Sequence, residues 1–190
     1  MACLSVASSL WVLQKVLWAG FVLYRNLGSG PSCQASIVHY PQGGKDLENA
    51  VQLRVTVKRP WKVLPGQFVY ITIPHGFGLI QAHPYMIAWV LDNETSLEQT
   101  IVLLVRTEQG FSSRLRLCSE ATPVILDGPY GGAQHHRLSQ YDKVLFMANG
   151  IGITSHLLSI RYLLMAHDDR TARVRRLSLV WFLETKGKNP

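Results

Sequence analysis

The pattern of hydrophobic and polar residues changes twice along the chain. Residues 2–24 are largely apolar. Between Val51 and Val57 every second residue is hydrophobic, which is typical of a strand with one buried face. Further short runs predict strands over 67–73, 85–91, 100–106 and 123–126. Short strands separated by turns with Gly and Pro favour a small closed antiparallel β-barrel.

A different pattern begins after this predicted barrel. The short apolar run 143–148 is typical of a buried parallel strand, and glycines follow it. Hydrophobic residues then recur at helical intervals over 153–166, and 177–183 predicts another strand. Strand, loop, helix and strand form one βαβ unit, the beginning of a doubly wound α/β sheet. Because one unit is not a whole domain, we expect an incomplete nucleotide-binding domain.

The apolar N-terminal segment approaches the ~20 residues that a membrane span needs. Lys15 lies in its middle, where a charge in lipid is costly, and no basic residue precedes the segment, which disfavours a signal peptide. We expect the end of a membrane helix or an interfacial helix. The predicted organisation is a juxtamembrane or membrane-end helix with its linker over 1–31, a β-barrel over 32–132 and an incomplete α/β domain over 138–190.

Composition excludes several classes of protein. Hydrophobic content of 47% supports a packed core, and three scattered cysteines suit a reducing compartment better than a disulfide framework. His135 and His136 have no third ligand near them in the sequence, so no metal site is expected.

The net charge of +7 includes a dense basic run at Arg170, Arg173, Arg175 and Arg176. No aromatic residues alternate with these arginines and no nucleic-acid motif is visible, so a solvated turn before a strand is favoured and no nucleic acid is expected. A basic face toward anionic lipid stays open. A basic lipid- or nucleic-acid-interaction module is therefore the weakest of the alternatives.

Three segments carry candidate chemistry. The first is His83-Pro84-Tyr85-Met86, at the start of a predicted strand. Tyr85 offers a flat ring, His83 can donate a hydrogen bond to a phosphate or ribityl oxygen, and Pro84 fixes the backbone between them. An ordinary strand start with a capped histidine has the same composition.

The second candidate segment opens a short predicted helix over 110–118. Its first turn contains Gly110, Ser112 and Ser113. A helix N-terminus presents free N–H groups and the positive end of a dipole, and serine hydroxyls add donors, so a pyrophosphate fits there. A serine cap without a ligand is the alternative.

The third candidate is a pair of glycine loops. Gly128-Pro129-Tyr130-Gly131 follows the last predicted barrel strand, and glycine permits close approach to a ligand. Gly150 and Gly152 lie between a strand and a helix, where a nucleotide phosphate meets a helix end. Thr154 is the expected helix cap and a candidate phosphate ligand. A plain turn explains either loop alone.

In this order, the segments resemble the cytosolic dehydrogenase half of the membrane ferric reductases and NADPH oxidases. In that family a His-Pro-Phe-Thr/Ser box holds FAD, and Gly-Pro-Tyr/Phe-Gly and Gly-Gly-x-Gly-Ile loops face the nicotinamide nucleotide. The resemblance is strongest to fungal members and covers about 9–183. It includes three further segments: Arg59-Pro-Trp-Lys-Val63, Pro65-Gly-Gln-Phe-Val-Tyr70 and Leu179-Val-Trp-Phe182.

The resemblance implies a ferredoxin-reductase-like FAD barrel, with FAD's pyrophosphate at 110–113. It implies an oxidoreductase module that passes electrons from NADPH (NADH is not excluded) through FAD to a haem. That haem lies in a membrane part outside this chain, and ferric iron or a related metal is the acceptor. The protein is then membrane-associated through its N-terminal segment, with the FAD/NAD(P) region in the cytosol.

Two residues depart from the family pattern. Met86 stands where the family has a hydroxyl, and a thioether cannot donate a hydrogen bond to the flavin. Asn149 stands where the family usually has glycine, although asparagine tolerates positive φ better than most residues. These departures keep a second hypothesis open, a truncated and non-catalytic flavin-binding fragment. No residue is assigned as catalytic.

Overall fold

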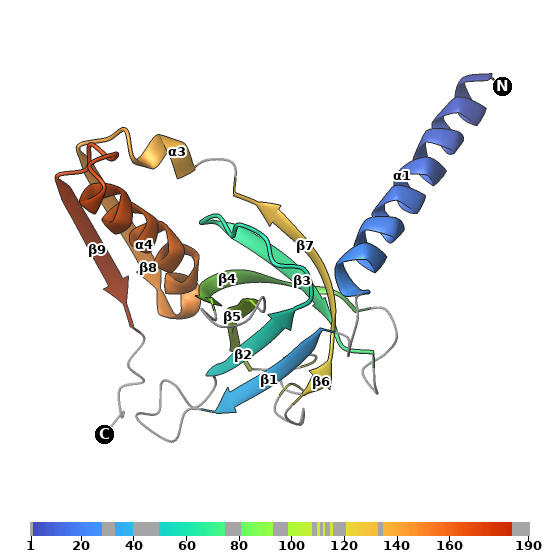
Figure 1. The fold of residues 1–190 in the computed structure, drawn as a ribbon, viewed down its shortest axis with the longest axis horizontal. Coiled ribbons are helices and arrows are strands. Elements are labelled where there is room, and N and C mark those ends of the chain that lie inside the picture. Colours follow the sequence, from blue (N-terminus) through green and yellow to red (C-terminus); the bar gives the residue numbers. More distant parts are fainter. Residues whose placement is uncertain are drawn as a thin grey trace, which may run out of the picture.

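The computed structural model describes residues 2–27, 33–39, 50–74, 81–92, 99–107, 110, 112, 115, 121–132 and 135–183. An N-terminal helix is followed by a curled antiparallel sheet and then by a small α/β unit (Figure 1). The predicted linker at 28–31 lies outside the described residues.

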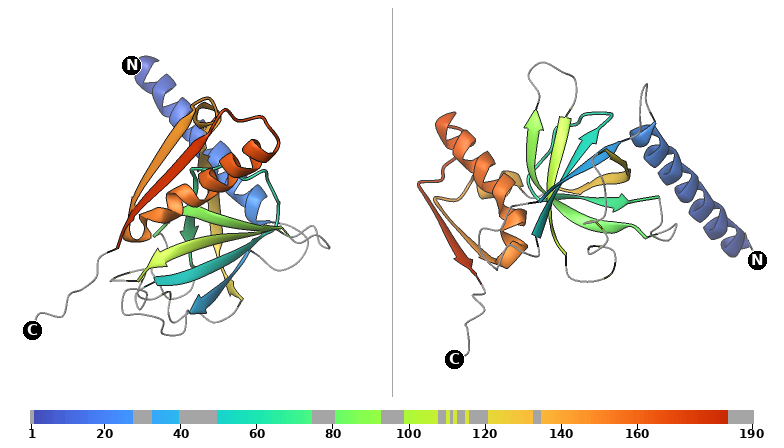
Figure 2. Two further views of the ribbon diagram at one scale, coloured as in Figure 1. Left: turned by 90° about the vertical axis from the view of Figure 1, so that its left-hand side faces the viewer. Right: turned by 90° about the horizontal axis from the view of Figure 1, so that it is seen from below.

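Seven strands form the antiparallel sheet in the order β6-β1-β2-β5-β4-β3-β7. The edge strands β6 and β7 are neighbours in sequence, separated by Val124 alone, so the sheet curls until its edges meet in one segment of chain (Figure 2). The predicted barrel is therefore confirmed as a curled half-barrel. The strands are β1 (Gln34–His39), β2 (Ala50–Val57), β3 (Gln67–Thr72), β4 (His83–Asp92), β5 (Gln99–Arg106), β6 (Thr122–Pro123) and β7 (Ile125–Gly131).

The core lies inside this curl. The alternation predicted along β2 is confirmed, because its buried residues are the hydrophobic ones from Val51 to Val57. Leu53, Ile71 and Leu103 are fully buried. Burying a side chain of this size stabilises the fold by about 1.5–3 kcal/mol.

The last strand differs from the prediction over 123–126. The chain leaves the sheet at Val124 and then continues in β7 as far as Gly131. Phe68 lies opposite Tyr130 whereas Tyr70 lies opposite Asp127, so the register shifts between them. A β-bulge of this kind accommodates proline, which has no N–H to donate. The segment 128–131 is thus part of a strand rather than a loop after it.

The α/β unit contains β8 (Lys143–Asn149), a 3₁₀ turn η2 (Gly150–Ile153), α4 (Thr154–Asp168) and β9 (Arg176–Phe182), after a short helix α3 (His135–Leu138). The predicted parallel pairing of its strands is confirmed.

The prediction of a buried strand over 143–148 is only half right. Val144 and Phe146 are buried, but Leu145 and Met147 are 57% and 61% exposed, because α4 covers one face of the pair. On α4 itself, Leu158 is buried and Leu164 is exposed.

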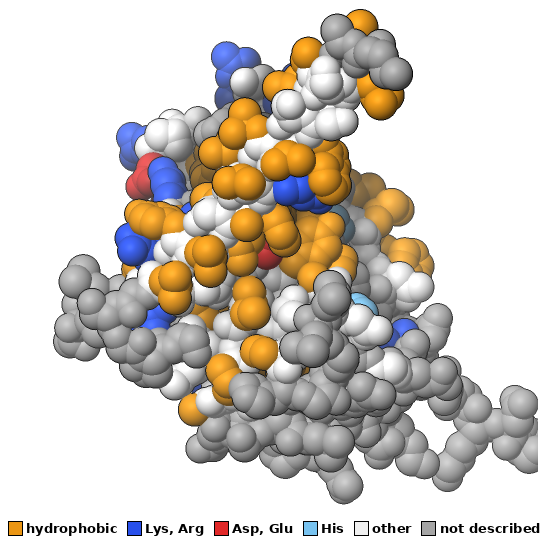
Figure 3. All heavy atoms as spheres, turned by 90° about the vertical axis from the view of Figure 1, so that its right-hand side faces the viewer, with side chains coloured by type: hydrophobic (Ala, Val, Ile, Leu, Met, Phe, Trp, Pro, Cys, Tyr) orange, Lys and Arg blue, Asp and Glu red, His pale blue; other side chains and the backbone are white. Residues whose placement is uncertain are grey.

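Helix α1 (Ala2–Asn26) confirms the predicted apolar helix. Its hydrophobic side chains are exposed along most of its length (Figure 3). By length and composition, it could cross a membrane.

The C-terminal end of α1 is fixed to the barrel. The Asn26 side chain donates to the Leu126 carbonyl (2.7 Å) and accepts from the Leu126 N–H (2.8 Å). The Arg25 guanidinium lies 4.7 Å from the centre of the Trp61 ring and donates to the Arg59 carbonyl (3.0 Å). These contacts hold the helix against β7 and the segment before β3.

Candidate functional site

Strand β3 brings two of the candidate segments together. β3 lies between β4 and β7, and Phe68 on β3 is opposite both Met86 on β4 and Tyr130 on β7. Side chains directly opposite each other in an antiparallel pair share a face. The box at 83–86 and the segment at 128–131 therefore flank one residue, although they are far apart in sequence.

We call the resulting surface the outer aromatic face: Phe68, Tyr70, Pro84, Met86 and Tyr130. The centroids of the Phe68, Tyr70 and Tyr130 rings lie 5.8 Å from one another. These rings are partly buried, whereas the alternate residues of β3 point into the core and are fully buried. A surface of this kind can bind a flat aromatic ligand.

Asp127 connects this face to helix α1. One carboxylate oxygen accepts the Tyr130 hydroxyl (2.6 Å), and the other accepts the Trp18 indole N–H (3.1 Å). Burial raises the pKa of Tyr130, and the hydrogen bond to Asp127 adds to that effect. The hydroxyl therefore remains protonated and donates, so the carboxylate fixes the Tyr130 ring beside the apolar helix.

The four residues of the first box do not share a face. Pro84 and Met86 lie opposite the outer residues of β3, but His83 and Tyr85 lie opposite Ile71 and Val69, which are core residues. Tyr85 packs against the core, and burial raises its pKa to about 12.

Sequence reasoning missed the rings of Phe68 and Tyr70 as site residues. Their segment was noted only for its resemblance to other proteins. The signal was present in the alternation of β3, where two of the three outward positions are aromatic.

Packing explains the glycine that ends β7. Gly131 has φ +78, and a Cβ there would lie 2.8 Å from the Gly66 carbonyl oxygen. Nearby, the buried Gln67 side chain accepts from the Trp61 indole (3.3 Å) and from the Leu64 N–H (2.9 Å). The approach of β7 to the turn before β3 therefore depends on glycine.

Most of the predicted helix over 110–118, including Ser113, lies outside the described residues. Gly110 is exposed with φ +69, and a Cβ there would meet nothing within 4 Å. Ser112 is partly buried, and Leu115 is fully buried.

The second glycine loop lies where the carboxyl ends of β8 and β9 meet. Gly150 has φ +50, and its carbonyl accepts the Trp181 indole N–H (2.9 Å). A Cβ on Gly150 or on the exposed Gly152 would meet nothing within 4 Å. This end of a parallel pair is where open α/β sheets bind ligands.

One expectation about this loop is wrong. Thr154 is the first residue of α4 and is buried, rather than a cap, because the 3₁₀ turn continues directly into the helix. Asn149 has φ −122, so its tolerance of positive φ is not used, and Gly150 takes the positive φ instead. None of the contacts described above joins this loop to the outer aromatic face.

Comparison with known proteins identifies the barrel. A family model described as an FAD-binding domain matches residues 34–134. A probable cell surface ferric reductase, kap2, of Aspergillus oryzae is 32% identical over 148 residues, which cover 70% of this chain and 19% of that protein. Ferric/cupric reductase transmembrane component 2 of Saccharomyces cerevisiae is 27% identical over 129 residues, which cover 63% of this chain and 17% of that protein. The chain thus spans less than a fifth of the length of these relatives.

Solved structures show the same fold. The ferredoxin reductase in carbazole 1,9a-dioxygenase superposes with a TM-score of 0.57 at 17% identity, over 81% of this chain and 42% of that one. A flavohemoglobin from Malassezia yamatoensis, with bound FAD and heme, gives a TM-score of 0.56 at 14% identity, over 95% of this chain and 46% of that one. The predicted ferredoxin-reductase-like fold is confirmed.

Proposed function

The chain belongs to the ferric reductase family, whose FAD-binding domain it contains, and we propose that it is the flavin-carrying module of an oxidoreductase. In this proposal electrons pass from NADPH to a haem in a membrane part, and on to ferric iron or a related metal acceptor. The observation that supports it most is the outer aromatic face, held beside an apolar helix within an FAD-binding barrel.

FAD, when bound, supplies the conversion of a two-electron hydride donor into single electrons. The residues of the barrel fit such a group. The three rings of the outer aromatic face offer an aromatic surface for an isoalloxazine. The open space beside Gly110 suits a pyrophosphate, with Ser112 and Ser113 as donors. We assign FAD binding to these residues and to the box at His83, Pro84, Tyr85 and Met86, of which Pro84 and Met86 lie on the outer aromatic face.

The nicotinamide nucleotide is assigned to the two glycine loops. The segment from Gly128 to Gly131 would face it from the barrel, beside the Tyr130 ring proposed for the flavin, and Gly150 and Gly152 would face it from the α/β unit. The buried position of Thr154 limits its contribution to its backbone or to packing. NADPH is proposed over NADH on the family resemblance alone.

The same proposal divides the chain into a membrane-end helix with its linker (1–31), an FAD-binding barrel (32–132) and part of an NAD(P)-binding domain (138–190). The barrel and nucleotide region lie on the cytosolic side. The contacts of Trp18 and Asn26 support a flavin site beside the membrane, because they fix α1 against β7.

Ferricyanide tests this proposal, since it accepts single electrons without a haem. The purified chain with FAD and NADPH should reduce ferricyanide, and omitting FAD should abolish the reaction. NADH in place of NADPH measures the nucleotide preference. An absence of turnover with FAD bound would reject catalysis by this chain and favour the second candidate, a flavin-binding fragment without activity.

The presence of Met86 favours the second candidate, a flavin-binding fragment without activity. It occupies the outer aromatic face opposite Phe68, in the place of the family's hydroxyl residue. Met86→Ser supplies the missing donor, and one hydrogen bond contributes about 0.5–1.5 kcal/mol. We expect FAD to bind roughly threefold to tenfold more tightly, or flavin reduction by NADPH to accelerate by that factor.

Met86→Leu is the matched control, because it keeps the size and adds no donor, and it should change neither quantity. If Met86→Ser only lowers the melting temperature, Met86 is a packing residue and the assignment of this box to the flavin is mistaken.

A further inference from the structure

The turn between α4 and β9 carries a cluster of exposed arginines. We call it the arginine turn: Arg170, Arg173, Arg175 and Arg176. The side chains of all four are exposed. No ion pair joins any of them to a carboxylate within the part of the chain that the structure describes. Their charge is therefore available to a partner.

The backbone of this turn is well anchored. The Arg173 N–H donates to the Ser139 carbonyl (2.8 Å), and the N–H groups of Arg175 and Arg176 donate to the Asp142 carbonyl (2.8 and 3.1 Å). Lys143, also exposed, lies opposite Arg176 in the parallel pair. The positive charge is thus presented by a fixed surface.

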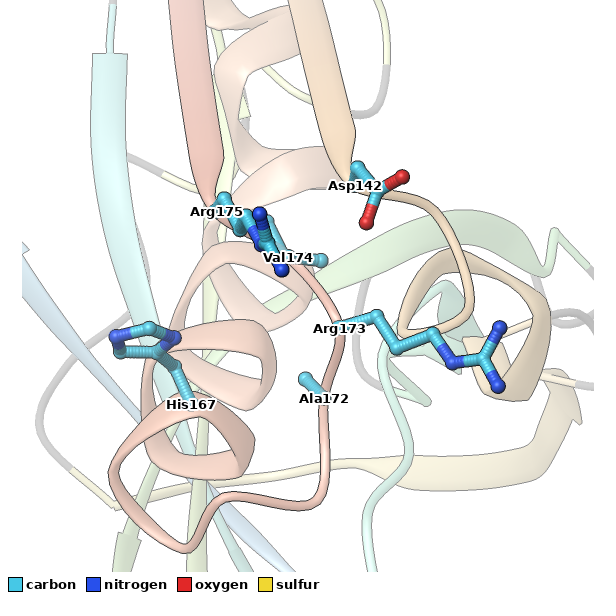
Figure 4. A pocket seen from close by; sticks show the side chains of 6 residues that line it. All are labelled: Asp142, His167, Ala172, Arg173, Val174 and Arg175. Carbon is cyan, nitrogen blue, oxygen red and sulfur yellow. The ribbon is translucent and has the colours of Figure 1, made fainter.

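The side chains of Arg173 and Arg175 spread over a surface instead of converging (Figure 4). Arg173, Arg175 and His167 line a shallow hollow together with Asp142, and Figure 4 shows the two guanidinium groups and the imidazole pointing in different directions. Asp168 and Asp169 directly precede the turn in sequence and Asp142 lies beside it in the structure, so the acidic residues are fewer than the basic ones. This arrangement suits many separate phosphates better than one bound anion.

The position of the arginine turn separates it from the proposed nucleotide site. It ends at Arg176, the first residue of β9, and Lys143 begins β8, so the cluster lies at the amino ends of both strands. Gly150 and Gly152 lie at the carboxyl ends. A nucleotide bound at those glycines therefore does not account for the arginines.

The arginine turn and helix α1 lie at opposite ends of the molecule, but both rise above the barrel in the view of Figure 1. In Figure 1 and in the left view of Figure 2, α1 rises from the barrel toward the upper side, and α3 and the turn after α4 lie on that side too. A membrane that receives α1 and extends over this upper side of the barrel has the arginine turn facing its surface. Arg137, exposed on α3, adds to the same basic surface.

We propose that the arginine turn is a contact surface for the anionic headgroups of the membrane that receives α1. This proposal rests on the membrane association in the proposed function. Each arginine near an anionic surface raises membrane affinity about fivefold, and the attraction is screened by salt. An apolar helix combined with a basic patch gives two independent signals for one membrane. The turn thereby fixes the orientation of the α/β unit relative to the bilayer.

Binding of the full chain to vesicles tests this surface. Partition is measured at limiting lipid into neutral phosphatidylcholine vesicles and into vesicles that also contain phosphatidylserine, at low and high salt. The wild-type chain should favour the anionic vesicles at low salt and lose that preference at high salt. Arg173→Gln combined with Arg175→Gln should reduce binding to anionic vesicles by roughly 25-fold, two factors of five. Binding to neutral vesicles, through α1, should not change.

Two control variants separate charge from other effects. Arg173→Lys with Arg175→Lys keeps the charge and should keep the preference. Arg106→Gln removes an exposed arginine from the end of β5, opposite the first residue of β2. In Figure 1, β2 begins on the lower side of the barrel, away from α1, so this variant should also keep the preference.

A glutamine double variant that retains the wild-type preference for anionic vesicles would overturn the proposal. A wild-type chain that shows no preference for anionic vesicles would also overturn it. This includes the case in which the arginine turn binds an oligonucleotide in a salt-sensitive way and not the anionic vesicles. FAD binding is measured on the same preparations. If the wild-type chain does not bind FAD, the proposed flavin function is wrong, and the vesicle-binding result can still be interpreted.

Discussion

Replacing Gly131 with alanine should lower the free energy of unfolding by about 2–4 kcal/mol. A residue with a Cβ at φ +78 costs roughly 1–2 kcal/mol, and overlap with the Gly66 backbone oxygen at 2.8 Å adds overpacking strain. Since Gly131 lies opposite Gln67, the loss should disturb the junction of β3 and β7. Thermal unfolding of the protein without ligand measures the effect.

Gly152→Ala is the matched control, because its φ is not positive and its Cβ would meet nothing within 4 Å. It should unfold within about 0.5 kcal/mol of the wild type. If Gly131→Ala unfolds like the wild type and loses only nucleotide binding, this glycine serves the ligand and the packing argument fails.

Replacing Tyr130 with alanine should weaken FAD binding roughly 5- to 150-fold. The ring lies between β3 and the carboxylate of Asp127, and stacking on one aromatic side chain contributes about 1–3 kcal/mol. Fluorescence titration of FAD gives the dissociation constants. Tyr130→Phe keeps the ring and loses only the hydrogen bond, so it should bind FAD within about tenfold of the wild type.

Tyr141→Ala is the control for removing a tyrosine ring, because Tyr141 is 59% exposed and lies after α3, away from the outer aromatic face. It should leave FAD affinity unchanged. Equal affinities for Tyr130→Ala and the wild type would show that the flavin binds elsewhere on the barrel.

Local pattern was sufficient for much of the fold. The alternation of β2, the apolar helix α1 and the parallel pair β8 and β9 could all be predicted, because each depends on a period that the sequence displays. The exposed face of β8 could not be predicted, since the period shows which residues share a face and not whether another element covers that face.

The candidate site depends on pairings that no local pattern reveals. Trp18 and Asp127 are 109 residues apart, and their hydrogen bond requires α1 to dock on β7. The bulge opposite Val69 sets Tyr130 against Phe68, and only the sheet register shows it. The sequence segments were therefore recognisable, whereas only the structure shows that the side chains of Tyr85 and Met86 lie on opposite faces of the sheet.

Titration of the purified chain with FAD, followed by visible absorbance and thermal unfolding, tests the central claim most directly. A flavin-binding barrel should bind one FAD saturably and should melt at a higher temperature when FAD is bound. At an FAD concentration a hundred times the dissociation constant, stabilisation should be about 2.7 kcal/mol. A folded chain that shows no saturable binding and no rise in melting temperature would contradict the assignment of this barrel as a flavin-binding module.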